Sequence, residues 1–455
     1  MSHAIEKERR KIREEIAEFD TLIKYIEDRP YKSAHLTDFK KWLSLCRSAM
    51  LKDLPLCLDR ITEGFPNTEK SRKLHEFRSN IKRLRDLLFS FLLSSEVPRE
   101  LYCLCDLFLE YNKTPANYMI CVYEEIASLP MTYLLKRFGF EETHPKFWGL
   151  MSQYEFYFIQ VTSSFKETDS AIDWPIVLHE MSHVICKERG IDDLYLQSIS
   201  IYRSLRVLDQ YVNGLLPSGA TALVEIATKK LYMTEYLADF FVTKCFAGAF
   251  GWRFLEKYVD LIDLFETDRD RAHPAPDKRV QKMMEEIKNT LDDDKIPKFM
   301  ATELTKLLGR KGTRIDERLA RLDTTNIDKE VDPVLTSLIA KLHKEFEYTF
   351  TLQRIKDSIE ETQWFRVLND LSGRKTISRN ISKKCFNTLL QKFCEDFENA
   401  TPIVVDPSTL YYLVLLLHMN ACSSKKPVDK KHKENLNRLL ADSIRLYFVQ
   451  KVFFS

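Results

Sequence analysis

The sequence predicts a mainly α-helical protein of the α+β class, in which helical N- and C-terminal regions flank a central domain with a small edge sheet. Glycine accounts for only 11 of the 455 residues, and the tight turns of β-rich folds need many residues with positive φ. Apolar residues recur at helical spacing through most of the chain, whereas one segment has the composition of a strand. The longest apolar run, residues 410–419, is too short to span a membrane and is typical of a buried core helix.

The N-terminal region, residues 1–115, is predicted to be helical. Residues 4–29 are good helix formers, and apolar side chains recur there with the period of an amphipathic helix. The side chains expected to face the core are Ile5, Ile12, Ile16, Phe19, Ile23 and Ile26. Similar patterns continue to about residue 112. They are interrupted at Pro30, Pro66 and Pro98. These stripes indicate helices that pack against one another.

The central region, residues 116–290, contains the predicted strand and the start of a helix. Residues 154–162 are rich in aromatic and β-branched side chains, which favours a strand. Asp173 is followed by Pro175, and an acceptor side chain with an early proline is typical of a helix start.

Helical patterns dominate the rest of the chain. They extend over residues 192–266, with an interruption near residues 213–219. A charged loop is predicted over residues 268–279, and Val280 is predicted to begin another helix. The C-terminal region, residues 291–455, is predicted to contain further helices joined by polar stretches.

Composition and charge narrow the class of protein. Apolar residues make up 44% and charged residues 30% of the chain, the balance of a soluble globular protein. The net charge is +2, so we expect neither nucleic acid nor an anionic membrane as a partner. None of the 10 cysteines has the C-x-x-C spacing of a structural zinc site, and free thiols are typical of a reducing cytosol. The N-terminus lacks the apolar core of a signal peptide. We therefore expect a soluble, cytoplasmic protein without a membrane span.

Residues 176–185 contain the pattern HExxH. In a helix, positions four apart share a face, so the imidazoles of His179 and His183 can reach one metal ion. Glu180 is turned by about 100° from His179, which places its carboxylate beside the ion, where a base can take a proton from zinc-bound water. The pattern predicts a zinc site. The alternative is a polar pair of histidines in a helical core.

A catalytic zinc needs a third protein ligand and leaves its fourth position to water. No further histidine follows at the short spacing of three-histidine sites, so a carboxylate is the alternative. Glu235 and Asp239 lie four residues apart and are surrounded by apolar residues. Glu235 is the predicted ligand, and Asp239 is predicted to accept a hydrogen bond from a ligand histidine. Carboxylates at this spacing are otherwise often solvated surface.

These residues resemble the motifs of the gluzincin metallopeptidases, most closely the HtpX-type and prenyl-protein-processing zinc peptidases. The pattern of those peptidases is HExxH, then E-x-x-A-D on a later helix, then H-P followed by an arginine. In this chain the pieces are His179-Glu180-Met181-Ser182-His183, Glu235-Tyr236-Leu237-Ala238-Asp239, and His273-Pro274 followed by Arg279. The resemblance covers about residues 150–290. It implies a zincin-like metallopeptidase core that holds Zn2+ through His179, His183 and Glu235.

The resemblance also implies an activity, the hydrolysis of peptide bonds by a zinc-activated water with Glu180 as general base. His273 is the candidate donor to the oxyanion, and Arg279 is expected to brace the loop that carries it. An alternative of equal weight is a turn histidine with Arg279 in a structural ion pair. The strand over residues 154–162 precedes the HExxH helix, as the substrate-binding edge strand does in zincins. A peptide substrate is expected to add along that edge.

Other functions stay open. The named peptidases are mostly membrane-embedded and this chain has no spanning segment, so their substrates are not carried over. A looser likeness to soluble regulatory zinc peptidases that cleave transcription repressors leaves a regulatory role open. We expect a protein or peptide substrate, with a regulatory protein partner for the helical flanks as an open alternative. A peptidase-like zinc-binding scaffold or sensor is the alternative function. The alternative of a nucleic-acid-associated protein is supported only by the basic patches at residues 78–86 and 425–433. Patches of this kind are more often solvated helix faces.

Overall fold

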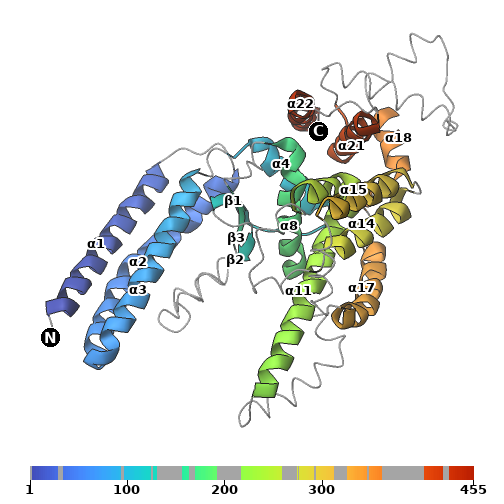
Figure 1. The fold of residues 1–455 in the computed structure, drawn as a ribbon. Helices are drawn as coiled ribbons and strands as arrows, with labels where there is room; N and C mark the ends of the chain where they lie inside the picture. The colour runs from blue at the N-terminus through green and yellow to red at the C-terminus, as the bar shows by residue number, and fades with distance from the viewer. Residues whose placement is uncertain are drawn as a thin grey trace, which may run out of the picture. The chain divides into compact units, whose positions relative to one another are not determined.

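A computed structural model of the chain contains two compact units (Figure 1). The first unit comprises residues 1–99 and 116–169, and the second comprises residues 100–115 and 170–455. The residues that the structure describes are 3–28, 34–93, 97–123, 127–130, 156–162, 170–191, 217–258, 274, 276–291, 294–311, 325–345, 348–360, 404–423 and 430–454.

Three long helices form most of the first unit. They are α1 (His3–Asp28), α2 (Ala34–Gly64) and α3 (Asn67–Leu93), and α1 packs against both of the others. The six apolar side chains predicted to face the core from α1 are all buried, which confirms the amphipathic pattern. α3 begins directly after Pro66, as predicted, whereas α2 continues through Pro55.

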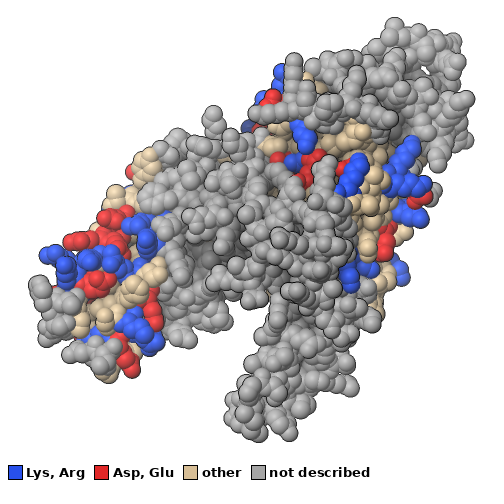
Figure 2. Space-filling view, in the orientation of Figure 1, with Lys and Arg blue, Asp and Glu red and all other residues tan. Residues whose placement is uncertain are grey.

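Ion pairs link the polar faces of these helices. Nε of Arg47 in α2 donates to Asp20 of α1 at 2.9 Å, and Nε of Arg78 in α3 donates to Glu15 of α1 at 2.7 Å. Basic and acidic side chains are interspersed on the face of the helices drawn in Figure 2. Partly exposed pairs of this kind contribute little to stability, so burial of the apolar stripe is the main stabilising term.

A three-stranded sheet completes the first unit. β1 (Tyr118–Tyr123) pairs in parallel with one side of β3 (Tyr157–Thr162), and β2 (Ala127–Pro130) pairs antiparallel with its other side. The strand predicted over residues 154–162 is therefore confirmed, but it is the central strand. The expectation that it offers an edge to a peptide substrate is wrong, because β1 and β2 occupy both of its edges.

The sheet packs against the helices of the same unit. Phe39 of α2 contacts the rings of Phe156 and Phe158, with centroids 5.4 and 5.8 Å away, and α3 lies against β1. β1 and β2 were not predicted from the sequence. The stretch YMICVY of β1 has the aromatic and β-branched composition that would have indicated a strand.

Most described residues of the second unit are helical, and no strand occurs among them. Its α-helices are α4 (Arg99–Tyr111), α8 (Trp174–Glu188), α11 (Pro217–Phe246), α12 (Gly248–Arg253), α14 (Pro276–Leu291), α15 (Lys295–Lys311), α17 (Thr325–Glu345), α18 (Leu352–Glu360), α21 (Pro407–Ser423) and α22 (Lys430–Phe454). A 3-10 helix, η2 (Ala171–Asp173), precedes α8, and a π-helix, η3 (Phe254–Tyr258), follows α12. α11 is the central element, since it packs against α8, α12, α14, α17 and α21.

α8 begins where the sequence predicted a helix start, but Asp173 does not cap the helix in the predicted way. Asp173 occupies the N-cap position and Pro175 lies in the first turn. However, the Asp173 carboxylate makes no capping bond. It accepts instead a hydrogen bond of 2.6 Å from Nε of Arg253, and both side chains are buried. The helix start therefore depends on proline and on an ion pair with α12.

The predicted start of the helix at Val280 is wrong. The helix begins at Pro276, four residues before the predicted start at Val280, so Arg279 lies on a helix and not in the charged loop. A proline is well tolerated in the first turn because its missing N–H would have no partner there.

The C-terminal helices agree with the apolar pattern. Residues 410–417 of α21 are buried apart from the half-buried Leu416, which confirms a core helix. Within the part of the chain that the structure describes, no helix combines the length and apolar character needed to cross a membrane. The three predicted domains, with boundaries at residues 115 and 290, stay a prediction. The two compact units are groups of residues that pack together, and they do not test those boundaries.

Candidate metal centre

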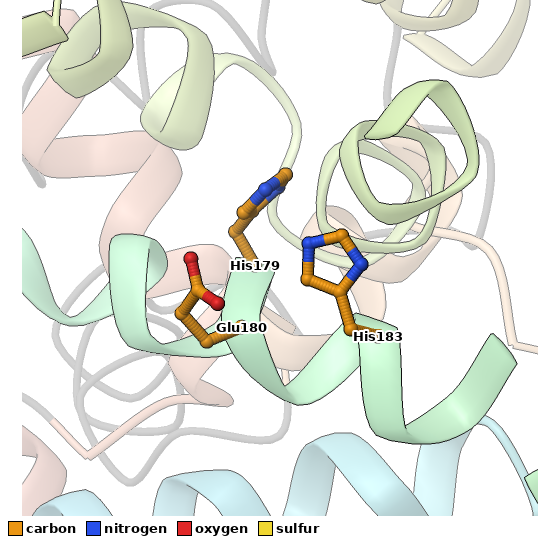
Figure 3. A group of neighbouring side chains, drawn as sticks. All are labelled: His179, Glu180 and His183. Atoms are coloured by element: carbon orange, nitrogen blue, oxygen red, sulfur yellow. The ribbon is translucent and has the colours of Figure 1, made fainter. Parts of the chain in front are cut away.

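α8 brings together the two histidines and the glutamate of HExxH. His179, Glu180 and His183 project from one side of the helix into the same space (Figure 3). One ligand atom from each lies within 4.8 Å of the other two, an arrangement that could hold a metal ion. His179 is 4% exposed and Glu180 is 7% exposed. The periodicity argument from the sequence is therefore matched by the placement of all three side chains.

Glu235 of α11 lies opposite both histidines. Its Oε2 is 3.4 Å from Nε2 of His179, and its Oε1 is 3.4 Å from Nε2 of His183. Charge-assisted N–H···O bonds are usually about 2.8 Å long, so both separations are long for hydrogen bonds. The helix packing of α11 on α8 thus places one carboxylate between two imidazole nitrogens.

His179, His183 and Glu235 are side chains of the types that bind zinc, whereas the group whose ligand atoms all lie within 4.8 Å of one another among the described residues is His179, Glu180 and His183. Zinc binds nitrogen and oxygen ligands at about 2.1 Å in a tetrahedron, so neighbouring ligand atoms lie about 3.4 Å apart. The separations between Glu235 and the two histidine nitrogens are both 3.4 Å, but each involves a different oxygen of Glu235, so these distances alone do not define a tetrahedral site. Two imidazoles and one carboxylate also form a ligand set that catalytic zinc sites use.

Asp239 lies one turn after Glu235 and faces the other nitrogen of His179. Its Oδ1 is 3.1 Å from Nδ1 of His179, and the Asp239 side chain is buried. A carboxylate in this position keeps the proton on Nδ1 and leaves the Nε2 lone pair available to a metal. The sequence predicted that Asp239 accepts a hydrogen bond from a ligand histidine; the two side chains are close, but Nδ1 of His179 has no hydrogen-bond partner in this structure, so the role stays a prediction.

Arg279 of α14 joins the two carboxylates. Its Nε and one Nη donate to the two oxygens of Asp239, both at 2.7 Å, which forms a bidentate pair. Its other Nη lies 3.1 Å from Oε2 of Glu235. Arg279 therefore contacts the candidate ligand Glu235 and the carboxylate of Asp239 directly. His273, the loop residue that Arg279 was expected to support, lies outside the described residues.

The charged groups of the cluster shift one another's pKa values. Burial opposes ionisation of Glu235, but the nearby Arg279 and His183 outweigh it and hold the pKa of this carboxyl well below its usual value. Burial also opposes ionisation of Asp239, and Arg279 lowers its pKa in the same way. For His179, burial favours the neutral ring, yet the carboxylates of Asp239 and Glu235 raise its pKa to about 9. The two carboxylates are thus ionised at neutral pH, whereas the His179 ring is protonated there, so metal binding would have to release a proton from it.

Aromatic side chains behind the cluster were not recognised in the sequence. Phe250 of α12 stacks on the ring of His179, and Phe254 of η3 lies under the guanidinium of Arg279. Both belong to an apolar stretch that reads as ordinary core, so no sequence signal separates them from their neighbours.

No protein family, curated protein or solved structure matches the chain.

Proposed function

We propose that the chain is a zinc-dependent endopeptidase of the gluzincin type, with a zincin-like core around α8 and α11. The observation that carries the proposal is the position of Glu235, whose two oxygens each lie 3.4 Å from an imidazole nitrogen of the HExxH helix. A solvated surface carboxylate would have no reason to be buried between two histidines. His179, His183 and Glu235 would hold the zinc ion.

The residues around the ligands have distinct tasks in this proposal. When bound, zinc supplies an acidified water and polarises the scissile carbonyl of a peptide. Glu180 would act as the general base toward the attacking water and pass the proton to the leaving amine. Asp239 holds the Nδ1 proton of His179, and Arg279 fixes Asp239. His273 remains the proposed donor to the oxyanion.

The remaining parts of the proposal concern substrate and location. We propose a protein or peptide substrate, because a water activated by zinc and Glu180 suits the attack on an amide carbonyl. We also propose a cytoplasmic location, because Cys105, Cys245 and Cys422 form no disulfide, as is usual in a reducing compartment.

Replacement of Glu180 by glutamine tests the proposal. Glutamine keeps the shape of the side chain and removes its basicity, so the variant should bind zinc and fold as wild type does but lose cleavage. Mapping of new protein termini in cells that contain wild type or Glu180→Gln identifies the substrates. A confirmed substrate that both proteins cleave at the same rate would exclude Glu180 as the base.

A zinc-binding scaffold or sensor without peptidase activity is the second candidate. The ion pair of 3.1 Å between Arg279 and Glu235 favours it, because it gives the buried Glu235 carboxylate a structural partner that requires no peptidase chemistry. This candidate also predicts bound zinc. It differs in predicting no terminus that depends on Glu180.

A further inference from the structure

α12 presents an aromatic ring to the candidate metal centre. The ring of Phe250 lies nearly parallel to the imidazole of His179, with centroids 5.1 Å apart and an angle of 8° between the planes. His183 stands almost perpendicular to His179, at 86° and 5.0 Å. Phe250 is 1% exposed. Its distance and angle are those of an offset-stacked pair.

The stacked ring controls a motion of His179 that the polar contacts leave open. Nδ1 of His179 faces Asp239 at 3.1 Å, and its Nε2 faces Glu235 at 3.4 Å and a nitrogen of Arg279 at 3.5 Å. Two contact points define an axis through the imidazole, and the ring can still tilt about that axis. The lone pair of Nε2 lies in the plane of the ring, so the tilt decides where the lone pair points. A flat contact with Phe250 fixes that plane.

α12 is held firmly enough to serve as a reference for this plane. A Cβ atom at Gly248 would lie 2.4 Å from Cγ2 of Ile296, and one at Gly251 would lie 2.3 Å from Cε of Met300. The two glycines therefore allow α12 to approach α15 more closely than larger residues would. Phe250 lies between them in the sequence, on a helix that also packs against α8.

A second aromatic side chain, Phe254, packs beside Phe250 and contacts Arg279. Phe254 lies 5.9 Å from Phe250, and the guanidinium of Arg279 sits 4.6 Å from the Phe254 ring centroid. Arg279 binds both oxygens of Asp239. The aromatic pair thus contacts His179 directly and supports the arginine that fixes its acceptor.

We infer that Phe250 is a positioning residue of the metal centre, which sets the plane of His179 and thereby the direction of its Nε2 lone pair. The inference rests on the proposed zinc site. It assigns to Phe250 an effect on metal affinity and on ligand geometry, in addition to the packing that any buried phenylalanine provides.

Phe246 provides a matched control. It is a fully buried ring four residues earlier, at the end of α11, and it packs against Phe108 and Tyr411, with ring centroids 6.1 and 5.5 Å away. Phe250→Leu and Phe246→Leu remove the same atoms from the same unit. Both should lower the stability of the metal-free protein, whereas only Phe250→Leu should disturb the metal centre.

The experiment measures zinc affinity by competition with a chelator, and the visible absorption spectrum after substitution with Co2+. Phe250→Leu is expected to weaken zinc binding about 10-fold, the lower end of the range for losing a group that orients a ligand, and to shift the Co2+ spectrum. Phe246→Leu is expected to keep wild-type affinity and spectrum. If Phe250→Leu does not fold, Phe250→Met replaces it, since methionine fills an irregular space but offers no flat face.

Two results separate the inference from the proposed function. If wild type binds zinc and Phe250→Leu has the same affinity and the same Co2+ spectrum, Phe250 only fills space and the inference is overturned. If wild type binds no zinc, the proposed function fails first and the inference falls with it.

Discussion

Replacement of Asp239 by alanine removes the acceptor that joins His179 to Arg279. In the wild type this carboxylate accepts two bonds of 2.7 Å from Arg279 and faces Nδ1 of His179 at 3.1 Å. The variant leaves a buried guanidinium without the partner that it binds through two nitrogens. Loss of one member of a buried ion pair typically costs about 3–5 kcal/mol of unfolding free energy. Loss of a carboxylate that orients a ligand histidine weakens metal binding about 10- to 100-fold.

Asp173→Ala is the matched control for the stability effect. Asp173 also accepts hydrogen bonds from a buried arginine of the second unit, Arg253, with Nε at 2.6 Å. The ion pair has the same chemistry, but it lies at the start of α8 and does not contact the candidate ligands. Both variants should therefore lose a similar amount of stability when metal-free.

The assay pairs urea denaturation of the metal-free proteins with zinc titration against a chelator. Only Asp239→Ala should show weaker zinc binding. Equal zinc affinities for Asp239→Ala and wild type would refute the role of Asp239 in orienting His179. Equal losses of affinity in both variants would show that the effect follows from general destabilisation.

Two further predictions concern the packing around the site. Burial lowers the pKa of Lys244, which is fully buried, from 10.5 to about 8, so the unfolded chain binds more protons than the folded chain between these pH values. The unfolding free energy should therefore rise with pH across this window by a few kcal/mol, and Lys244→Met should abolish the rise in denaturation curves; a rise that persists would assign it to another group. Gly248→Ala should cost about 1–3 kcal/mol, because its Cβ would meet Cγ2 of Ile296 at 2.4 Å and Cδ2 of Leu415 at 2.9 Å. Gly251→Ala should cost less, because its Cβ meets mainly the mobile methyl end of Met300; the opposite order in thermal unfolding would show that α12 is not held as described.

Helices with one apolar face were predictable because their signal is local. Each of the six core positions of α1 follows from a 3.6-residue period and is buried. The same period placed His179 and His183, and separately Glu235 and Asp239, on shared helix faces. Spacing within a helix does not say which helices pack together, however. The meeting of α8 with α11 was predicted from the need for a third metal ligand and from motif resemblance, not from periodicity.

The parts that could not be predicted depend on tertiary contacts. The composition of a strand does not tell whether it is central or at an edge, since that depends on β1 and β2, which pair with both sides of β3. Arg279 was assigned to a loop because the helix start was placed at Val280, and only the fold shows its two bonds to Asp239. Phe250 belongs to an apolar stretch, and stacking on His179 leaves no mark in the sequence.

The zinc content of purified wild type, His183→Ala and Glu235→Ala, measured by elemental analysis and normalised to folded protein, is the most direct test of the ligand set. His183 and Glu235 come from different helices, and their side chains meet at 3.4 Å. Because each supplies one of three protein ligands, wild type should carry one zinc per chain and each variant should lose most of it on dialysis. Zinc retained equally by all three proteins, or absent from wild type purified without chelator, would contradict a metal centre at this position.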